Sequence, residues 1–206
     1  SVNITLSEHV VYHQVTDMLR DSAYSDVFAQ LGDQSGRAIA ESIDTQVFSQ
    51  FANFGTDLGT ANTAVTAQTI MKAAATLRAR KLTGPFYAVL HPAQAYGIKA
   101  NLTATTSYTA SGAIADSVLG GFYIGTIAGV QIFESALVPA SGSANNAVGA
   151  VFTPQALGHA MRGGIDMNTL YLPAARATDV VLKAVAGATV LNNVHGVAIT
   201  CDAQIN

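Results

Sequence analysis

The chain has 206 residues, with 10 basic and 13 acidic side chains and a formal net charge of −3. Charged residues make up 11% and hydrophobic residues 50%, with a mean hydropathy of +0.32, whereas an ordinary soluble domain is roughly 25% charged. This composition can build a packed core, which excludes intrinsic disorder. The net negative charge excludes a strongly basic nucleic-acid binder.

The low charge also bears on the surface. A folded monomer of 21.2 kDa exposes about 9,000 Å², over which so few charges would be thinly spread. Soluble monomers carry a denser surface of mixed sign. Either this surface is unusually poor in charge or neighbouring molecules cover much of it, and we favour the second interpretation.

A membrane protein and a disulfide-rich protein are both disfavoured. The most apolar window, Val180–Leu191, is short and interrupted by Lys183 and Gly187, whereas a spanning helix needs about 20 apolar residues. The single cysteine, Cys201, excludes an internal disulfide and a Cys-rich zinc site. Because no window is long and apolar enough to span a bilayer, we expect no membrane partner.

The segment before residue 20 fits two interpretations. In the first, Val11 and Val15 belong to the apolar side of a helix within Ile4–Arg20. In the second, Val10–Val15 is extended and Thr16 caps a short helix. The sequence alone does not choose between them.

One long helix is predicted over Ser25–Phe54, because apolar or small residues recur there every four positions. Ser25 is the expected N-cap, with Asp26 in the first turn. The recurring residues are Val27, Leu31, Ser35, Ile39, Ile43, Val47 and Phe51.

Two further features mark the predicted helix. Asp33, Arg37 and Glu41 lie four residues apart and are expected to form a short charge ladder. Gly32 and Gly36 leave one face bare, which indicates either close approach of another backbone or a bend.

The remaining elements complete an α+β pattern. A helix is expected from the Thr66 cap to about Lys81, then a buried strand at Phe86–Leu90, then a short helix beginning at Pro92. Another helix is expected over Pro154–Arg162. Further strands are expected at 122–128, 129–134, 148–152, 176–185, 189–193 and 196–201.

Residues that carry chemistry are sparse. His9 and His13, four apart, would share a helix face, but they lack a third ligand and the H-E-x-x-H order, so we favour a solvated or interface pair. Cys201 is expected to be a buried small residue, and His91 to lie at a helix N-cap. The basic residues of 78–81 suit a helix C-terminus better than a phosphate contact.

Five segments, in chain order, resemble the major capsid proteins of tailed bacteriophages of the Hong Kong 97 type. Leu31–Phe51 (LGDQSGRAIAESIDTQVFSQF) is similar to their long spine helix, and Gly84–Leu102 (GPFYAVLHPAQAYGIKANL) to their strand and His-Pro helix. Ile127–Ala140 resembles a run of their axial domain, and Ala147–Gly164 the strand and helix that follow it. Ala177–Asp202 is similar to their final strands.

The resemblance implies an α+β fold with one long spine helix, a peripheral domain and an axial domain. We expect residues 1–83 and 165–206 in the peripheral domain and 84–164 in the axial domain. Subunits of the family form pentamers and hexamers that close an icosahedral shell around double-stranded DNA. The resemblance therefore implies a structural virion protein, assembled in the bacterial host cytoplasm, that is not an enzyme and uses no cofactor or metal.

The expected partners are other copies of the chain, scaffold, portal and cement proteins, and packaged DNA through weak non-specific contacts. Two alternatives stay open: an encapsulin-type bacterial shell subunit, and a small metal-dependent enzyme supported only by His9 and His13. The loops at 101–112 and 141–146 are expected at the capsomer axis. The candidate interface residues are Asp33, Arg37, Glu41, Asn101, Thr105, Tyr108, Asn145 and Asn146.

Members of this family carry an N-terminal arm and a long β-hairpin before the spine helix, whereas about 25 residues precede it here. We therefore expect the chain to be a fragment, a maturation product or the ordered part of a longer protein. Residues 1–15 are then the returning end of that hairpin.

Overall fold

The computed structural model describes residues 2–23, 26–104, 123–141 and 145–203. The chain forms two compact units, Ser1–Val47 with His159–Thr189 and Phe48–Gly158 with Val190–Asn206. The expected domains divide elsewhere, at 83/84 and 164/165, and their assignment as peripheral and axial stays a prediction. The α+β class is confirmed, since both units combine strands with helices.

The first unit is built on a three-stranded sheet in the order β1-β8-β7. Strand β1 runs antiparallel to β8, with Ser7 opposite Ala186 and Thr16 opposite Ala177. The extended interpretation of this segment is therefore confirmed, and Thr16 Oγ1 accepts a hydrogen bond from the Leu19 N–H at 3.3 Å. The unit holds all or most of β1 (Ser7–Thr16), α1 (Asp17–Ser22), α2 (Val27–Ser49), β7 (Leu157–Leu172) and β8 (Ala177–Val190).

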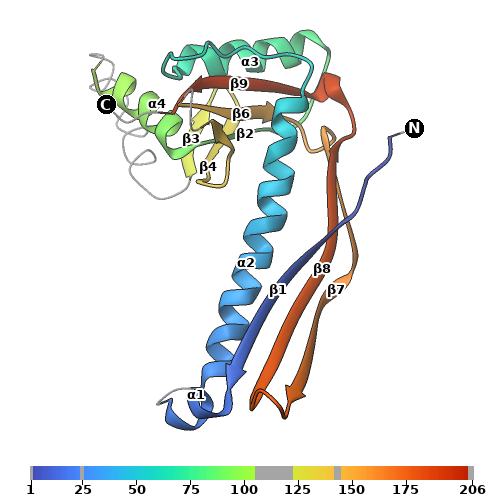
Figure 1. Ribbon diagram of the computed structural model, residues 1–206. Coiled ribbons are helices and arrows are strands. Elements are labelled where there is room, and N and C mark those ends of the chain that lie inside the picture. The colour runs from blue at the N-terminus through green and yellow to red at the C-terminus, as the bar shows by residue number, and fades with distance from the viewer. Residues whose placement is uncertain (1, 24–25, 105–122, 142–144, 204–206) are drawn as a thin grey trace. The chain divides into compact units, whose positions relative to one another are not determined.

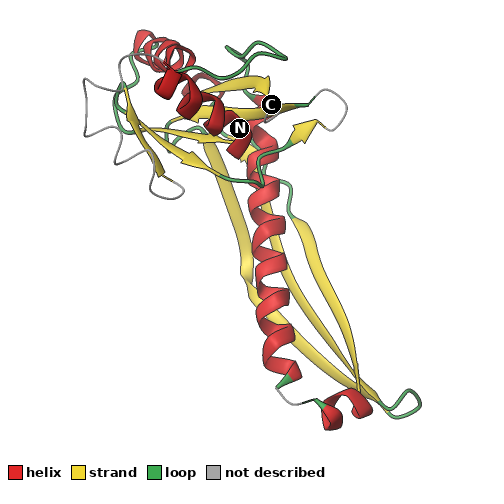
Figure 2. Cartoon of the chain, turned by 90° about the vertical axis from the view of Figure 1, so that its left-hand side faces the viewer, coloured by secondary structure: helices red, strands yellow, loops and turns green. Residues whose placement is uncertain are grey.

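Helix α2 confirms the predicted long helix, and a short 3₁₀ turn (Gln50–Asn53) follows it. Figures 1 and 2 show α2 running alongside the three strands. Ile39 is 1% exposed and packs with Val180, Leu182 and Ala184 of β8. The helix thus buries one stripe against the sheet, as its four-residue period requires.

The start of α2 corrects one expectation. The Asp26 carboxylate accepts hydrogen bonds from the N–H groups of Phe28 at 3.0 Å and Ala29 at 3.3 Å. Asp26 therefore caps the helix in place of the expected Ser25, which lies outside the described residues. A carboxylate at this position satisfies two free N–H groups and also complements the helix dipole.

The glycines of α2 do not bend the helix, and no other described backbone of the same subunit approaches them; approach by another copy stays a prediction. The helix is continuous through Gly32 and Gly36, and nothing in the described chain lies within 4 Å of a Cβ built at either position. The bare face is therefore open within the subunit.

The second unit is built on a mixed sheet whose strand order is β3-β4-β2-β6-β5, with β9 also paired to β6. Strands β2 and β4 are parallel, and the other pairings are antiparallel. The expected strands at 86–90, 129–134 and 148–152 are confirmed. The bounds are β2 (Phe86–Leu90), β3 (Tyr123–Ile127), β4 (Val130–Glu134), β5 (Ala140–Ser141), β6 (Asn146–Phe152) and β9 (Gly196–Asp202).

Helices α3 (Ala67–Ala79) and α4 (Pro92–Ala104) contribute apolar side chains to one core of this unit. Ile70, Leu77 and Ile98 are 0% exposed and pack with the buried residues of β2, β4 and β9. A second core forms around Phe51, whose ring lies 5.5 Å from that of Phe152. The expected Thr66 cap is confirmed, since its Oγ1 accepts from the Thr69 N–H at 3.3 Å.

The helix expected over residues 154–162 is wrong, because this stretch forms a turn and the start of β7. Gly158 is buried, and a Cβ there would lie 2.7 Å from the Leu191 side chain. The Gly163-Gly164 pair does not end an element either: Gly163 has a φ of +72° and lies within the strand. Pairing with β8 overrides the local helix signal. The expected run 176–185 is confirmed within β8, whereas the run 189–193 is mostly wrong, because β8 ends at Val190 and a 3₁₀ turn begins at Asn193.

Candidate assembly surfaces

A row of three charges lies on the exposed side of α2. Asp33, Arg37 and Glu41 are all exposed. The expected ladder is not formed, because no ion pair within 4.0 Å joins Arg37 to either carboxylate in the described structure. These charges therefore remain available to another molecule.

The other candidate interface residues fall into three groups. Asn145 is exposed in a turn, with a φ of +49°. Asn101 lies in the last turn of α4, where its side chain is not described, and Thr105 and Tyr108 lie outside the described residues. Asn146 is only 7% exposed, which argues against a contact with a neighbour.

Asn146 has a role inside the subunit. Its Oδ1 accepts a hydrogen bond from the backbone N–H of Asn62 at 2.8 Å. This bond holds the loop after the 3₁₀ turn against the beginning of β6. The side chain of Asn146 is therefore engaged within the subunit and is not presented to a neighbouring copy.

His9 and His13 lie on strand β1 and not on a helix. The Nδ1 atom of His9 is 2.7 Å from Ser42 Oγ, and its Nε2 atom is 3.2 Å from Gln46 Oε1. His9 thereby links β1 to α2. The described residues hold no group of three or more His, Cys, Asp and Glu side chains that could bind a metal.

The basic residues at the end of α3 hydrogen-bond within the subunit. Arg78 donates to the carbonyl of Ala128 at 2.5 Å. Arg80 donates to the carbonyl of Val194 at 2.9 Å and to Thr56 Oγ1 at 2.6 Å. These contacts favour a structural role for both side chains over a phosphate site.

The remaining candidate groups are buried or partly buried. Cys201 is 2% exposed, and burial raises the pKa of its thiol, which makes the reactive thiolate scarce. The expected cap at His91 is confirmed, because its Nδ1 accepts a hydrogen bond from the Ala93 N–H at 3.3 Å. Burial lowers the pKa of His91.

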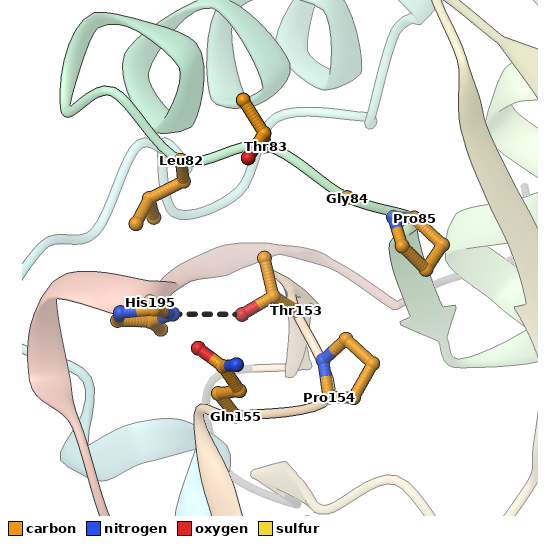
Figure 3. A pocket seen from close by; sticks show the side chains of 8 residues that line it. All are labelled: Leu82, Thr83, Gly84, Pro85, Thr153, Pro154, Gln155 and His195. Atoms are coloured by element: carbon orange, nitrogen blue, oxygen red, sulfur yellow. Dashed lines mark hydrogen bonds between the residues drawn. The ribbon is translucent and has the colours of Figure 1, made fainter.

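A pocket of about 150 Å³ lies in the second unit (Figure 3). Thr153 and His195 face each other there, with Thr153 Oγ1 3.0 Å from His195 Nδ1. No carboxylate lines the pocket, so the imidazole has no acidic partner to orient it for acid–base work. The lining residues are Leu82, Thr83, Gly84, Pro85, Thr153, Pro154, Gln155 and His195.

Sequence reasoning missed one surface, the exposed length of β7. Every residue from 161 to 171 is exposed, including Ile165 at 52% and Met167 at 50%. The alternation of Ile165 and Met167 with the polar residues Asp166 and Asn168 was the available signal.

The helices in the described parts of the chain include none long and apolar enough to cross a membrane.

Comparisons with known proteins connect this geometry to a family. The family model described as phage capsid protein matches residues 1–199. Comparison with curated protein sequences finds no match.

Solved structures share the fold at low sequence identity. A structure from Mycobacterium phage Che8 matches with a TM-score of 0.78 and 19% identity, covering 94% of this chain and 70% of that one. The capsid of Cyanophage P-SCSP1u matches with a TM-score of 0.76 and 21% identity, covering 98% of this chain and 74% of that one. The holo-SrpI encapsulin complex from Synechococcus elongatus matches with a TM-score of 0.73 and 15% identity, covering 96% of this chain and 73% of that one.

The fold thus defines a class, the shell-forming proteins of the Hong Kong 97 type, as the resemblance implied. Within it, the chain belongs to the phage capsid protein family. It is a self-assembling structural subunit of a phage head and a component of the virion, in a family that is not enzymatic.

Proposed function

We propose that copies of this chain form pentamers and hexamers that close the head around double-stranded DNA, with the charge row of α2 at a contact between copies. The observation that carries this contact is that Asp33, Arg37 and Glu41 are exposed and form no ion pair with one another. The row spans about 12 Å at 1.5 Å per residue. The negative, positive, negative order of these charges can pair with a positive, negative, positive row on a second copy. Such pairing would fix the position of the two copies along each other.

The capsomer axis is the second proposed contact. Asn145 supports it, because this exposed residue projects from a turn at the end of the sheet of the second unit. Asn101, Thr105 and Tyr108 belong to the other proposed axis loop. We assign the axial domain to 84–164 and the peripheral domain to 1–83 and 165–206.

The remaining proposed partners are scaffold, portal and cement proteins, and the packaged DNA. The net charge of −3 supports a weak DNA contact, because few phosphates would be neutralised and few counterions released. A shell wall of this kind would enclose the DNA while binding it only weakly.

Charge reversal at Arg37 tests the α2 contact. We expect Arg37→Glu to lower the yield of closed shells at least tenfold, because it turns the row into three like charges. Lys72→Glu is the matched control, since Lys72 is also an exposed basic residue on a helix. Shell yields equal to wild type for Arg37→Glu, measured by sedimentation and negative-stain microscopy, would exclude the contact.

An encapsulin-type shell is the alternative that one observation favours, the match to the encapsulin complex of Synechococcus elongatus. The phage capsid family match over residues 1–199 outweighs it. The contents of purified shells separate the two, because a phage head holds nuclease-protected DNA and an encapsulin holds cargo protein.

A further inference from the structure

Strand β7 has an open edge. It lies at the end of the β1-β8-β7 sheet, so its outer backbone edge has no strand partner within the described chain. All its residues from 161 to 171 are exposed. In Figure 1, β8 separates β7 from β1 along the sheet.

Residues 165–172 of this edge lack the features that usually prevent an edge strand from pairing with a strand of another molecule. Natural edge strands are blunted by short length, bulges, prolines or charged side chains, above all lysine. Gly163, with a φ of +72°, interrupts the regular strand geometry near its middle. Residues 165–172, IDMNTLYL, contain no proline and no lysine, and their one charge, Asp166, is paired with Lys183 at 3.4 Å.

The same segment presents an apolar row. Ile165 and Met167 lie on one face of the strand, because alternate residues share a face, and they are 52% and 50% exposed. Tyr171 continues the row, with its hydroxyl donating to Asp17 at 2.9 Å. An open backbone edge beside exposed apolar side chains is the arrangement that accepts an added strand.

The opposite edge strand of the sheet is different. Strand β1 is packed on one face by α2, where Val11 contacts the core around Ile39. Val15 of β1 is 2% exposed. On its other face β1 does expose Val10 at 53% and Tyr12 at 55%. What distinguishes β7 is that its exposure is continuous from residue 161 to 171, whereas exposed residues of β1 are interrupted by buried and half-buried ones.

We propose that an extended segment of a second copy of this chain pairs with the edge of β7 over residues 165–172 in the assembled head and covers Ile165 and Met167. This proposal rests on the proposed assembly, since the chain belongs to a family whose subunits surround themselves with copies of one another. Main-chain hydrogen bonds supply the affinity, and the apolar row sets the register of the added strand.

Hydrogen exchange measured by mass spectrometry on closed shells and on dissociated subunits tests the proposal. We expect the peptide covering 165–172 to exchange at least tenfold more slowly in shells. The peptide covering β9 is the control, because its strand is already paired with β6 in the subunit. Closed shells with unchanged exchange over 165–172 would overturn the proposal and leave the shell function intact, whereas failure of the wild type to form shells would count against the shell function.

A pair of matched substitutions gives an independent readout. Met167→Lys is expected to lower the shell yield at least tenfold while the far-UV circular dichroism and Tm of the subunit stay those of the wild type. Met18→Lys, on α1, is the control, because Met18 is 82% exposed and lies outside β7. Wild-type yields for Met167→Lys would overturn the proposal, and should this variant fail to fold, the exchange experiment on the wild type decides.

Discussion

His91 and Gln94 cap helix α4 reciprocally. The Gln94 Oε1 atom accepts a hydrogen bond from the backbone N–H of His91 at 3.3 Å, while His91 Nδ1 accepts from the Ala93 N–H at 3.3 Å. This resembles a capping box, except that the N-cap side chain is an imidazole and accepts from the second helical residue instead of the third. Gln94 also donates from Nε2 to the carbonyl of Ala147 at 2.7 Å, which ties the cap to β6.

The cap makes stability depend on pH. Burial lowers the pKa of His91 below its ordinary value of about 6.5, so the unfolded chain takes up the proton first as the pH falls. We expect the His91 contribution to the free energy of unfolding to be present above about pH 6.5 and to decrease as the pH falls toward the lowered pKa. His91→Asn keeps an acceptor and removes the titration, so it should flatten this dependence in urea unfolding at pH 7.5 and 5.5. His159→Asn, at an exposed position, is the control, and an unaltered slope for His91→Asn would contradict the prediction.

The Gln94 side chain itself should be costly to remove. It is 0% exposed, and Gln94→Ala would leave the N–H of His91 and the carbonyl of Ala147 without their partner. We expect a loss of about 1–3 kcal/mol in the free energy of unfolding, the cost of unpaired buried polar groups. Gln155→Ala, at an exposed position, should change it little. Equal effects of the two substitutions in urea unfolding would show that the buried network is not stabilising.

Two serines of α2 should respond to alanine in opposite directions. Ser35 is 1% exposed and its hydroxyl has no hydrogen-bond partner among the residues that the structure describes, so Ser35→Ala should raise stability by about 1 kcal/mol. Ser42 lies on the same helix with its Oγ 2.7 Å from His9 Nδ1, so Ser42→Ala should lower stability by about 0.5–1 kcal/mol. Thermal unfolding of the dissociated subunits measures both. A loss of stability in Ser35→Ala would mean that the hydroxyl has a partner after all.

Two glycines make a similar pair. A Cβ at Gly149 would lie 2.7 Å from Leu90 Cδ2 and 2.9 Å from the carbonyl oxygen of Val89, so Gly149→Ala should cost about 1–3 kcal/mol. A Cβ at Gly32 meets nothing within 4 Å inside a helix, so Gly32→Ala should add about 0.5–1 kcal/mol. Urea unfolding of dissociated subunits checks both values, and a stabilised Gly149→Ala would show that β2 and β6 are less tightly packed than described.

The sequence predicts those elements that depend only on residues close together in the chain. The period of α2 needs only its own residues, and the Thr66 cap needs only the N–H of Thr69. The turn before β7 is wrongly predicted as a helix, because Pro154 and the Gly163-Gly164 pair have the pattern of a helix start and a helix end. Its partner strand, β8, lies farther along the chain and decides the outcome.

The candidate surfaces divide in the same way. The exposure of Asp33, Arg37 and Glu41 follows from their position opposite the apolar stripe, so the sequence was sufficient. Asn146 accepts its hydrogen bond from the N–H of Asn62, 84 positions away, and no local pattern reports that contact. The open edge of β7 could not be predicted, because edge position is a property of the sheet order.

Cryo-electron microscopy of the assembled protein, together with its mass in solution, tests the central claim most directly. We predict closed icosahedral shells built of five-fold and six-fold capsomers, with the mass of many 21.2 kDa subunits. A stable 21.2 kDa monomer that forms neither capsomers nor shells at high concentration would contradict the account.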